Sequence, residues 1–327
     1  MAALILLGLA ILAVTIVDVV WTTFAAGSGA GPVTSRIADA AWRGALALHA
    51  RRPGHRALSA AGVAVAASVL VLWTALALVG WTLVFASAEG AVREPSGVPA
   101  SLSGRVYFVG FSVFTLGLGD LQPGEGWWRI ATAVMSGTGL VLVTLTITFL
   151  LPVVSAVSAR RQFANHVSSL GRSPTDLLTR AWSGSGFGSL SQHLTDLTPV
   201  VESLRQQRLA YPVVRYFHSV ERDAALGPAV VTLTEALHLL DAVDPDARPD
   251  PAATRPLLAA LDGLLAGVPP RAGDEVPAPD VQALIALDIP LVADAVPPST
   301  DVEERRARVV GLLVDEGWDD ELVRPRG

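Results

Sequence analysis

The sequence contains no cysteine and no lysine. Without cysteine the chain can form no disulfide, no thiolate zinc site and no thiol nucleophile. The histidines do not recur at the spacings that place two metal ligands on one helical face, so we expect no helical metal site. They are His49, His55, His166, His193, His218 and His238. Because we also find no set of nucleophile, base and orienting group and no phosphate-binding loop, we expect neither an enzyme nor a cofactor.

Charged residues are scarce and unevenly distributed. They make up 17% of the chain, against 51% hydrophobic residues. Residues 1–158 carry 8 arginines against 6 acidic residues, whereas residues 159–327 carry 16 arginines against 24 acidic residues, a net charge of −8. We therefore expect a membrane half followed by a water-soluble half. The negative charge of the second half disfavours nucleic acid and anionic lipid headgroups as its partners.

Three segments are long and apolar enough to cross a lipid bilayer, residues 1–25, 57–86 and 127–158. A bilayer core of roughly 30 Å requires about 20 apolar residues in a helix. Small residues at 25–28 are similar to a signal-peptide cleavage site. The first segment, however, lacks a basic start and its apolar run is too long for a signal peptide, so we expect a retained helix.

The positions of the arginines predict the orientation in the cell membrane. Short loops rich in arginine stay in the cytoplasm, and residues 26–56 hold five arginines against the single acid Asp39. Arg160 and Arg161 follow the third segment, whereas residues 87–126 hold four acidic residues against two arginines. The sequence predicts an N-terminus outside, three crossings and a cytoplasmic C-terminal half.

The C-terminal half has the pattern of short helices. Apolar residues recur every three or four positions within 194–209, 230–240, 257–265 and 309–313. Linkers rich in proline, residues 244–251 and 268–279, interrupt the pattern. The glycine cluster at 184–188 precedes no βαβ unit, so we expect a flexible linker there rather than a nucleotide-binding loop.

Residues 105–126, between the second and third apolar segments, are aromatic at first and rich in glycine afterwards. They are too short to span the membrane twice as helices, so we expect them to enter and leave on the same side. Non-helical backbone at membrane depth is tolerated only where it lines a water-filled or ion-filled path. We expect a helix from about Arg105 to Phe114, followed by an extended segment from Thr115 to Asp120.

The extended segment resembles the T-x-G-[YFL]-G-D selectivity filter of potassium channels. Its residues are Thr115, Leu116, Gly117, Leu118, Gly119 and Asp120. The preceding Tyr107, Phe108 and Ser112 lie where that family's pore helix has aromatic residues and a small hydroxyl residue. The resemblance covers residues 57–158. It implies a bacterial type of channel with one pore loop between two transmembrane helices, to which an N-terminal helix and a cytoplasmic domain are added.

The resemblance also implies how the motif would act. In this family, backbone carbonyls of the filter and the threonine hydroxyl replace the water shell of potassium. The carbonyls can all point inward only where alternate residues have unusual dihedrals, which Gly117 and Gly119 permit. Asp120 and Glu125 would add negative charge at the outer mouth. Because one loop supplies a quarter of the coordinating carbonyls, the resemblance implies a homotetramer.

Two residues depart from the family pattern. Phe114 takes the place of a second threonine, and Leu118 takes the place of the tyrosine whose hydroxyl bonds to the pore helix. We therefore expect apolar packing to hold the filter open. Potassium selectivity is then expected to be less rigid than in the commonest filters.

Three further positions in the third segment, Gly137, Gly139 and Pro152, form the expected gate region. Proline removes a helix hydrogen bond and kinks the helix. The alternative is that glycine and proline are simply common in membrane helices. Asp18 in the first segment is expected to pair with an arginine of the inner loop, with a proton or ion sensor as the alternative.

The sequence therefore predicts an all-α membrane protein with three transmembrane helices, a re-entrant pore helix and filter loop, and an α-helical cytoplasmic domain. The expected parts are residues 1–56, 57–158 and 159–327. The expected function is a homotetrameric potassium-selective channel in a lipid bilayer, with potassium as the permeant ligand. A weakly selective cation channel and a non-conducting membrane scaffold or regulator are the alternatives. No arginine ladder predicts a voltage sensor, and the gating stimulus and cytoplasmic ligand stay open.

Overall fold

The computed structural model describes residues 1–24, 30–51, 55–271, 282–292 and 300–318 of the 327-residue chain. The small residues at 25–28 and residues 272–279 of the second expected linker lie outside these ranges. The chain divides into two compact units, of which the first comprises Met1–Ala41 and Val63–Val153 and the second comprises Trp42–Gly62 and Val154–Gly327. The expected functional division at residues 56 and 158 stays a prediction.

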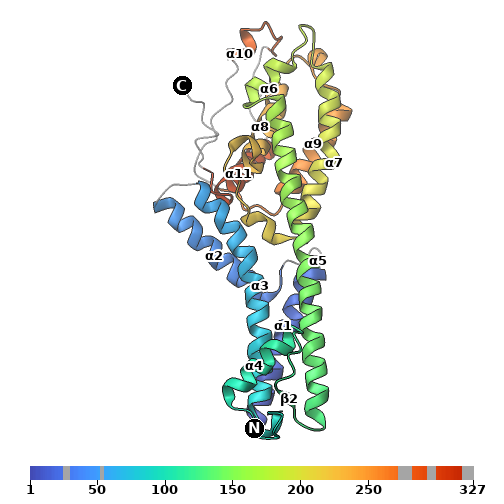
Figure 1. Cartoon of the computed structure of the whole chain (residues 1–327). Helices are drawn as coiled ribbons and strands as arrows, with labels where there is room; N and C mark the ends of the chain where they lie inside the picture. Colours follow the sequence, from blue (N-terminus) through green and yellow to red (C-terminus); the bar gives the residue numbers. More distant parts are fainter. Residues whose placement is uncertain (25–29, 52–54, 272–281, 293–299, 319–327) are drawn as a thin grey trace. The chain divides into compact units, whose positions relative to one another are not determined.

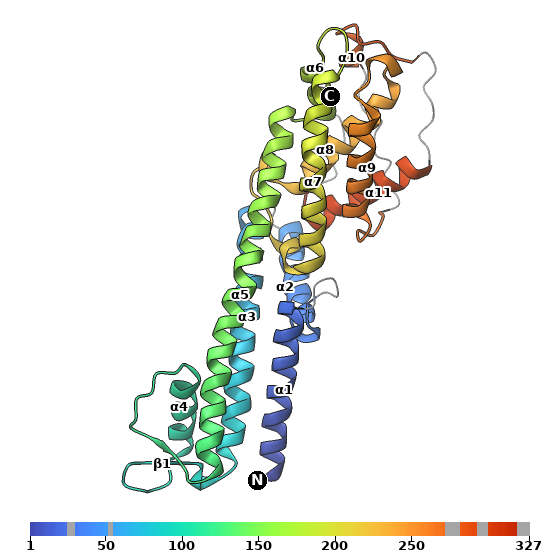
Figure 2. The same cartoon turned by 90° about the vertical axis from the view of Figure 1, so that its right-hand side faces the viewer.

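Three helices are long and apolar enough to cross a membrane: α1 (Ala2–Phe24), α3 (His55–Ala86) and α5 (Trp127–Leu170). Within the first unit they run side by side (Figures 1 and 2). The first two match the expected segments closely, but α5 continues past residue 158 to Leu170 and passes through Pro152. The expected inner loop, residues 26–56, contains instead the helix α2 (Pro32–Arg51).

Helix α1 packs closely against α3 through two glycines. A Cβ atom on Gly8 would lie 2.6 Å from the carbonyl oxygen of Gly80. A Cβ atom on Gly80 would lie 2.7 Å from Cγ of Leu12. Small residues let membrane helices approach until their backbones touch, which increases dispersion contact.

Asp18 of α1 is fully buried and joins α1 to α2 and α3. Its Oδ1 accepts hydrogen bonds from the backbone N–H groups of Val33 at 2.8 Å and Thr34 at 3.2 Å. Its Oδ2 accepts from the Thr34 hydroxyl and, at 3.0 Å, from the indole N–H of Trp73. The first amides of a helix have no intrahelical partner, and the helix dipole favours a negative charge there. Asp18 therefore caps α2, and among the described residues its hydrogen-bond partners are backbone amides, a hydroxyl and an indole rather than the expected arginine.

The second unit is a bundle of short helices (Figure 1). Its elements after α5 are α6 (Pro174–Ala181), α7 (Gly188–Ala210), η2 (Pro212–Tyr216), η3 (Arg222–Ala224), α8 (Leu226–Leu239), η4 (Leu240–Ala242), η5 (Pro245–Ala247), α9 (Pro251–Leu265), α10 (Gln282–Ile285) and α11 (Thr300–Asp315). The four apolar segments expected to be helical fall mainly in α7, α8, α9 and α11, so the helical periodicity predicted these elements correctly.

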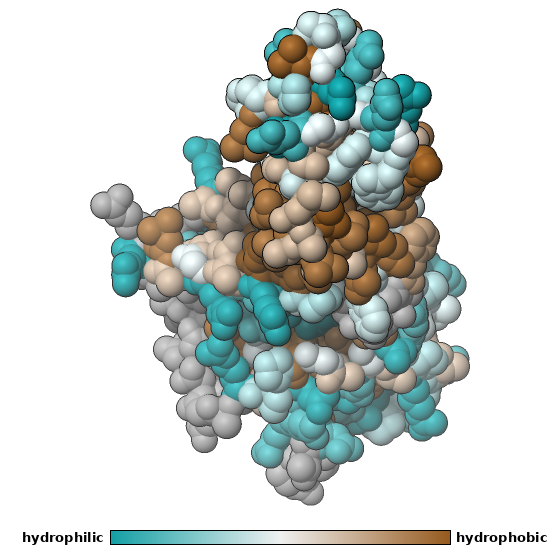
Figure 3. Space-filling model, turned by 90° about the horizontal axis from the view of Figure 1, so that it is seen from below, coloured by the Kyte–Doolittle hydropathy of each residue, from teal (hydrophilic) through white to brown (hydrophobic). Residues whose placement is uncertain are grey.

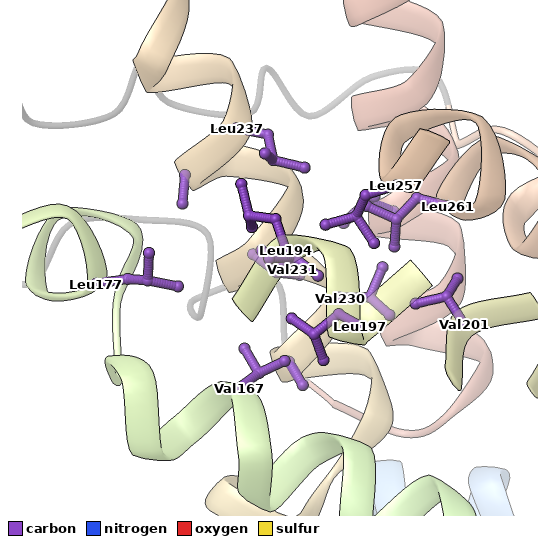
Figure 4. Packing of buried hydrophobic residues seen from close by; sticks show 14 of the residues in the cluster. Val167, Leu177, Leu194, Leu197, Val201, Val230, Val231, Leu237, Leu257 and Leu261 are labelled. Atoms are coloured by element: carbon purple, nitrogen blue, oxygen red, sulfur yellow. The ribbon is translucent and has the colours of Figure 1, made fainter. Parts of the chain in front are cut away.

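An apolar core holds the described part of the second unit together. Helix α7 packs along α9, and α6 and α11 pack against α8. Figure 4 shows Leu194 and Leu197 of α7 beside Val230 of α8 and Leu257 of α9. Val167 of α5 belongs to the same core, so the continuous helix α5 connects the two units.

The glycine cluster at 184–188 is not the connection between the two halves. Phe187 within it is fully buried in the core of the second unit. The backbone N–H of Phe187 donates a hydrogen bond to the carbonyl of Ala247 at 3.0 Å. The expectation of a flexible linker at this place is therefore wrong.

Residues 42–62 join the second unit through its C-terminal end. The indole N–H of Trp42 donates to the carbonyl of Asp315 at 3.3 Å. His55 and His218 share a hydrogen bond of 2.9 Å, and the other ring nitrogen of His218 lies 2.7 Å from the carbonyl oxygen of Glu316. These contacts explain why the unit boundary falls after Ala41 rather than at residue 56.

A buried ion pair between α8 and α11 gives the first prediction. Arg306 binds Glu235 at 2.9 Å and 2.8 Å, and their side chains are only 11% and 5% exposed. Breaking a buried pair by removing one partner costs about 3–5 kcal/mol. We predict that Glu235→Ala lowers the free energy of unfolding by about that amount, measured by denaturant unfolding of the full chain in detergent.

Glu304→Ala is the matched control on α11, because Glu304 is exposed and pairs with Arg308 only four residues away. Its expected cost is below about 1 kcal/mol. Equal losses of stability in the two variants would contradict the structural role of the Glu235–Arg306 pair.

Candidate functional site

The candidate site is built on the short helix α4 (Leu102–Val113), which lies beside α3 and α5 within the first unit (Figure 2). The Ser101 hydroxyl accepts a hydrogen bond from the backbone N–H of Gly104, which caps the start of the helix. The Arg105 guanidinium donates to the carbonyls of Ala100 at 3.1 Å and Ala86 at 3.3 Å. Arg105 thereby fastens α4 to the end of α3. The helix was expected from Arg105 to Phe114. The observed helix begins three residues before Arg105 and ends one residue before Phe114.

Helix α4 is held by an aromatic core. The ring of Phe108 lies 5.5 Å from the ring of Phe85 and 5.2 Å from that of Phe111. Ser112 is also buried, whereas Tyr107 is 46% exposed. Tilted aromatic pairs at these distances add stabilisation beyond the area that they bury. The rigid packing of α4 fixes where the motif that follows it begins.

Helix α4 ends in a Schellman motif, which is completed by Thr115, the first residue of the T-x-G-x-G-D segment. The N–H of Leu116 donates to the carbonyl of Phe111 at 2.8 Å, and the N–H of Thr115 donates to the carbonyl of Ser112 at 3.1 Å. This arrangement requires a left-handed residue after the cap, which is usually glycine. Here the residue is Thr115, with φ of 56°. A threonine in that conformation costs free energy, and such outliers cluster at functional sites.

Positive φ angles recur at every second residue of the motif. They are 56° at Thr115, 60° at Gly117 and 79° at Gly119. The sequence predicts this conformation for the two glycines but not for the threonine. Leu116 and Leu118, which lie between these residues, are 64% and 55% exposed in the single chain.

Tyr107 of α4 and Asp120, the last residue of the motif, interact electrostatically. The two residues are thirteen positions apart, so no local sequence pattern predicts this interaction. The expectation that apolar packing holds the loop, because Leu118 lacks a hydroxyl, stays a prediction.

The chain after the motif is tied to the segment between α3 and α4 by a small ribbon. Strand β1 (Val92–Arg93) pairs antiparallel with β2 (Gln122–Pro123), and the N–H of Gly124 donates to the carbonyl of Ala91 at 2.8 Å. The sequence did not predict these strands. Glu125 follows the ribbon and is exposed, as is Asp120. The ribbon keeps both acids on one short loop.

The candidate gate residues lie in different surroundings on α5. A Cβ atom on Gly139 would lie 1.8 Å from the carbonyl oxygen of Val113, at the end of α4. Gly137 has open space around its Cα. Pro152 lies inside the helix, directly before the division of the chain into two units. Gly139 therefore allows α5 to touch α4, and a gating role for the three residues stays a prediction.

Large apolar side chains are exposed on the long helices of the first unit. Examples are Ile16 and Val17 of α1 and Leu140 and Val141 of α5. Figure 3 shows apolar side chains gathered in a continuous area on the face seen from below. An apolar surface of this kind is unfavourable in water and suits lipid or a neighbouring subunit.

The fold and the loop together define a class, that of all-α membrane proteins with an ion-channel domain. A family model described as "Ion channel" matches residues 68–156. The chain is also 36% identical over 234 residues to the "Uncharacterized membrane protein YdjJ" of Bacillus subtilis, a match that covers 71% of this chain and 68% of that protein. No solved structure matches the chain. The chain therefore belongs to the same family as this Bacillus membrane protein. It contains an ion-channel domain, and the ion-channel family is not a class of enzymes.

The contrast between Gly139 and Gly137 gives the second prediction. Alanine raises helix propensity equally at both positions, but at Gly139 its methyl group must displace the backbone of α4. We predict that Gly139→Ala is less stable than Gly137→Ala by about 1–3 kcal/mol, measured by thermal unfolding of the full chain in detergent. Equal stability of the two variants would show that α5 does not contact α4 as described.

Proposed function

We propose that the chain is one subunit of a homotetrameric potassium-selective channel whose filter is formed by residues 115–119. The alternation of φ at Thr115, Gly117 and Gly119 carries the proposal. In an ordinary extended chain successive carbonyls point to opposite sides. Alternating the sign of φ turns them toward one side, where their oxygens can replace the hydration shell of potassium.

The conformation of Thr115 supports the same function. Glycine would meet the backbone requirement of the Schellman motif without strain. Threonine meets it at a cost, but it adds a hydroxyl oxygen at the inner end of the row of carbonyls. The C-terminal end of α4, with its partial negative charge, directly precedes this residue and favours a cation nearby.

One loop per chain requires four chains around the pathway, so we propose closed fourfold symmetry. The exposed apolar residues of α1 and α5 are available for lipid and for neighbouring subunits. The distribution of arginines supports an outer N-terminus and a second unit in the cytoplasm. In this orientation Asp120 and Glu125 lie at the outer mouth, and Gly137, Gly139 and Pro152 lie on the helix that would line the cavity.

A weakly selective cation channel is the second candidate. Leu118 favours it, because a leucine cannot bond to α4 as a tyrosine would. The electrostatic interaction of Tyr107 with Asp120 favours the first candidate, because it links the last residue of the motif to the same helix.

The glycines of the motif give the third prediction. A Cβ atom added to Gly117 or Gly119 would meet no atom of the described residues within 4 Å, so their φ angles alone disfavour another residue. Each alanine costs on the order of 1 kcal/mol per subunit, repeated four times in one ring. We predict that Gly117→Ala and Gly119→Ala abolish potassium flux into liposomes while cross-linking still gives tetramers.

Gly110→Ala is the control, because Gly110 of α4 also has open space around it but has a helical backbone. It should retain potassium flux. Potassium-selective flux in the Gly117 or Gly119 variant would refute the filter assignment, and a dimer or pentamer on cross-linking would refute the tetramer.

A further inference from the structure

A pocket of about 290 Å³ lies within the second unit, between the C-terminal ends of α7 and α9 and the short helix η2. Three arginines line it: Arg205 and Arg208 from α7 and Arg215 from η2. The remaining lining is apolar side chain and glycine backbone, including Leu209, Pro212 and Leu264. The pocket therefore combines concentrated positive charge with an apolar wall.

Arg208 is the unusual member of this group. Its guanidinium makes one long hydrogen bond, 3.4 Å to the carbonyl of Leu264. Among the residues that the structure describes, no carboxylate lies within ion-pair distance of it. Burial lowers its pKa, partly opposed by the negative charge of Glu316. A guanidinium withdrawn from water without a counterion is costly, and buried charges are normally paired.

The two neighbouring arginines are positioned by features of the pocket itself. The side chain of Arg205 lies over Gly263, where a Cβ atom would come within 3.0 Å of its Cδ. Its contact with Glu202, at 3.3 Å, is between half-exposed groups and is therefore weak. The Arg215 guanidinium lies 4.8 Å above the ring of Tyr216 and donates a hydrogen bond to its hydroxyl at 2.8 Å. Arg208 is therefore the member of the group for which the described residues supply no ion-pair partner.

We propose that this pocket binds a small phosphate-bearing molecule, with Arg208 as the central contact to the phosphate. Arg205 and Arg215 hold the same group from either side, and Leu209, Pro212 and Leu264 contact the rest of the ligand. The planar fork of arginine matches phosphate oxygens in pairs. The Leu264 carbonyl uses one donor of Arg208, so the other donors face the ligand.

The size and charge of the surroundings indicate a soluble ligand. The volume is close to the lower end of small-molecule pockets, about 300 Å³. The net charge of −8 on residues 159–327 repels an anionic membrane surface. A small phosphate compound from solution can enter where a charged bilayer surface is disfavoured.

The pocket adjoins a segment that contacts α5. The carbonyl of Val214 in η2, next to Arg215, accepts a hydrogen bond from Arg160 of α5. Arg160 also forms an ion pair with Glu316, whose carboxylate accepts from the N–H of Gly227 at 2.9 Å. The regulatory step rests on the proposed function. A phosphate held by Arg215 and Arg208 stabilises one conformation of η2 and thereby changes the opening of the channel.

Thermal unfolding of the full chain in detergent tests the binding, with inorganic pyrophosphate compared with chloride at equal ionic strength. The wild type should melt at a higher temperature in pyrophosphate. Arg208→Gln should bind at least about tenfold more weakly, since it loses charge-assisted hydrogen bonds, yet without pyrophosphate it should melt no lower than the wild type. Arg208→Lys, which keeps the charge without the fork, should be intermediate.

Arg255→Gln is the matched control, because Arg255 is exposed on α9 outside the pocket lining. It should respond to pyrophosphate as the wild type does. The same measurement with phosphatidylcholine vesicles, with and without phosphatidic acid, distinguishes the source of the phosphate. Stabilisation by phosphatidic acid alone would overturn the soluble ligand, and no Arg208-dependent effect of either probe would overturn the site.

Potassium flux from liposomes tests the regulatory consequence separately. Pyrophosphate should change the flux of the wild type and of Arg255→Gln but not that of Arg208→Gln. Binding through Arg208 without any change in flux would overturn the regulation and leave the site standing. Absence of flux in every protein, with binding intact, would count against the proposed channel function and not against the pocket.

Discussion

The proposed filter depends on one constraint of the backbone: neighbouring carbonyls of an extended chain point in opposite directions, whereas a bare cation needs oxygens that converge. Positive φ at Thr115, Gly117 and Gly119 would meet this need at a cost in strain. The Schellman motif of α4 supports the strained segment where it begins. Asp120, where the segment ends, interacts electrostatically with Tyr107 of α4.

Much of this arrangement could be predicted, because it follows from local patterns in the sequence. The lengths of the apolar runs predicted α1, α3 and the start of α5, and the helical spacing predicted the main helices of the second unit. Glycine at 117 and 119 predicted the unusual dihedrals. The features that were missed depend on contacts between distant segments. They are the capping of α2 by Asp18, the interaction of Tyr107 with Asp120, and the burial of Phe187 in the core of the second unit, where a flexible linker was expected.

The second unit depends on α5 in a different way. Val167 of α5 lies in its core, and Arg160 of α5 is held by Val214 and Glu316. Any rearrangement of η2 or of the chain around Glu316 must therefore change contacts made by the same helix that contributes Gly137, Gly139 and Pro152 to the first unit. In the proposed channel, this continuous helix is a direct physical connection between the proposed phosphate pocket and the proposed ion pathway. Phosphate bound at the proposed site would act on α5 through these contacts.

In the proposed channel the carbonyl row selects potassium. The reversal potential of the purified wild-type chain in a planar bilayer tests this, with potassium on one side and an equal concentration of sodium on the other. Since potassium alone would cross, we expect a reversal potential far from zero, with the sodium side positive. A reversal potential at zero would refute potassium selectivity.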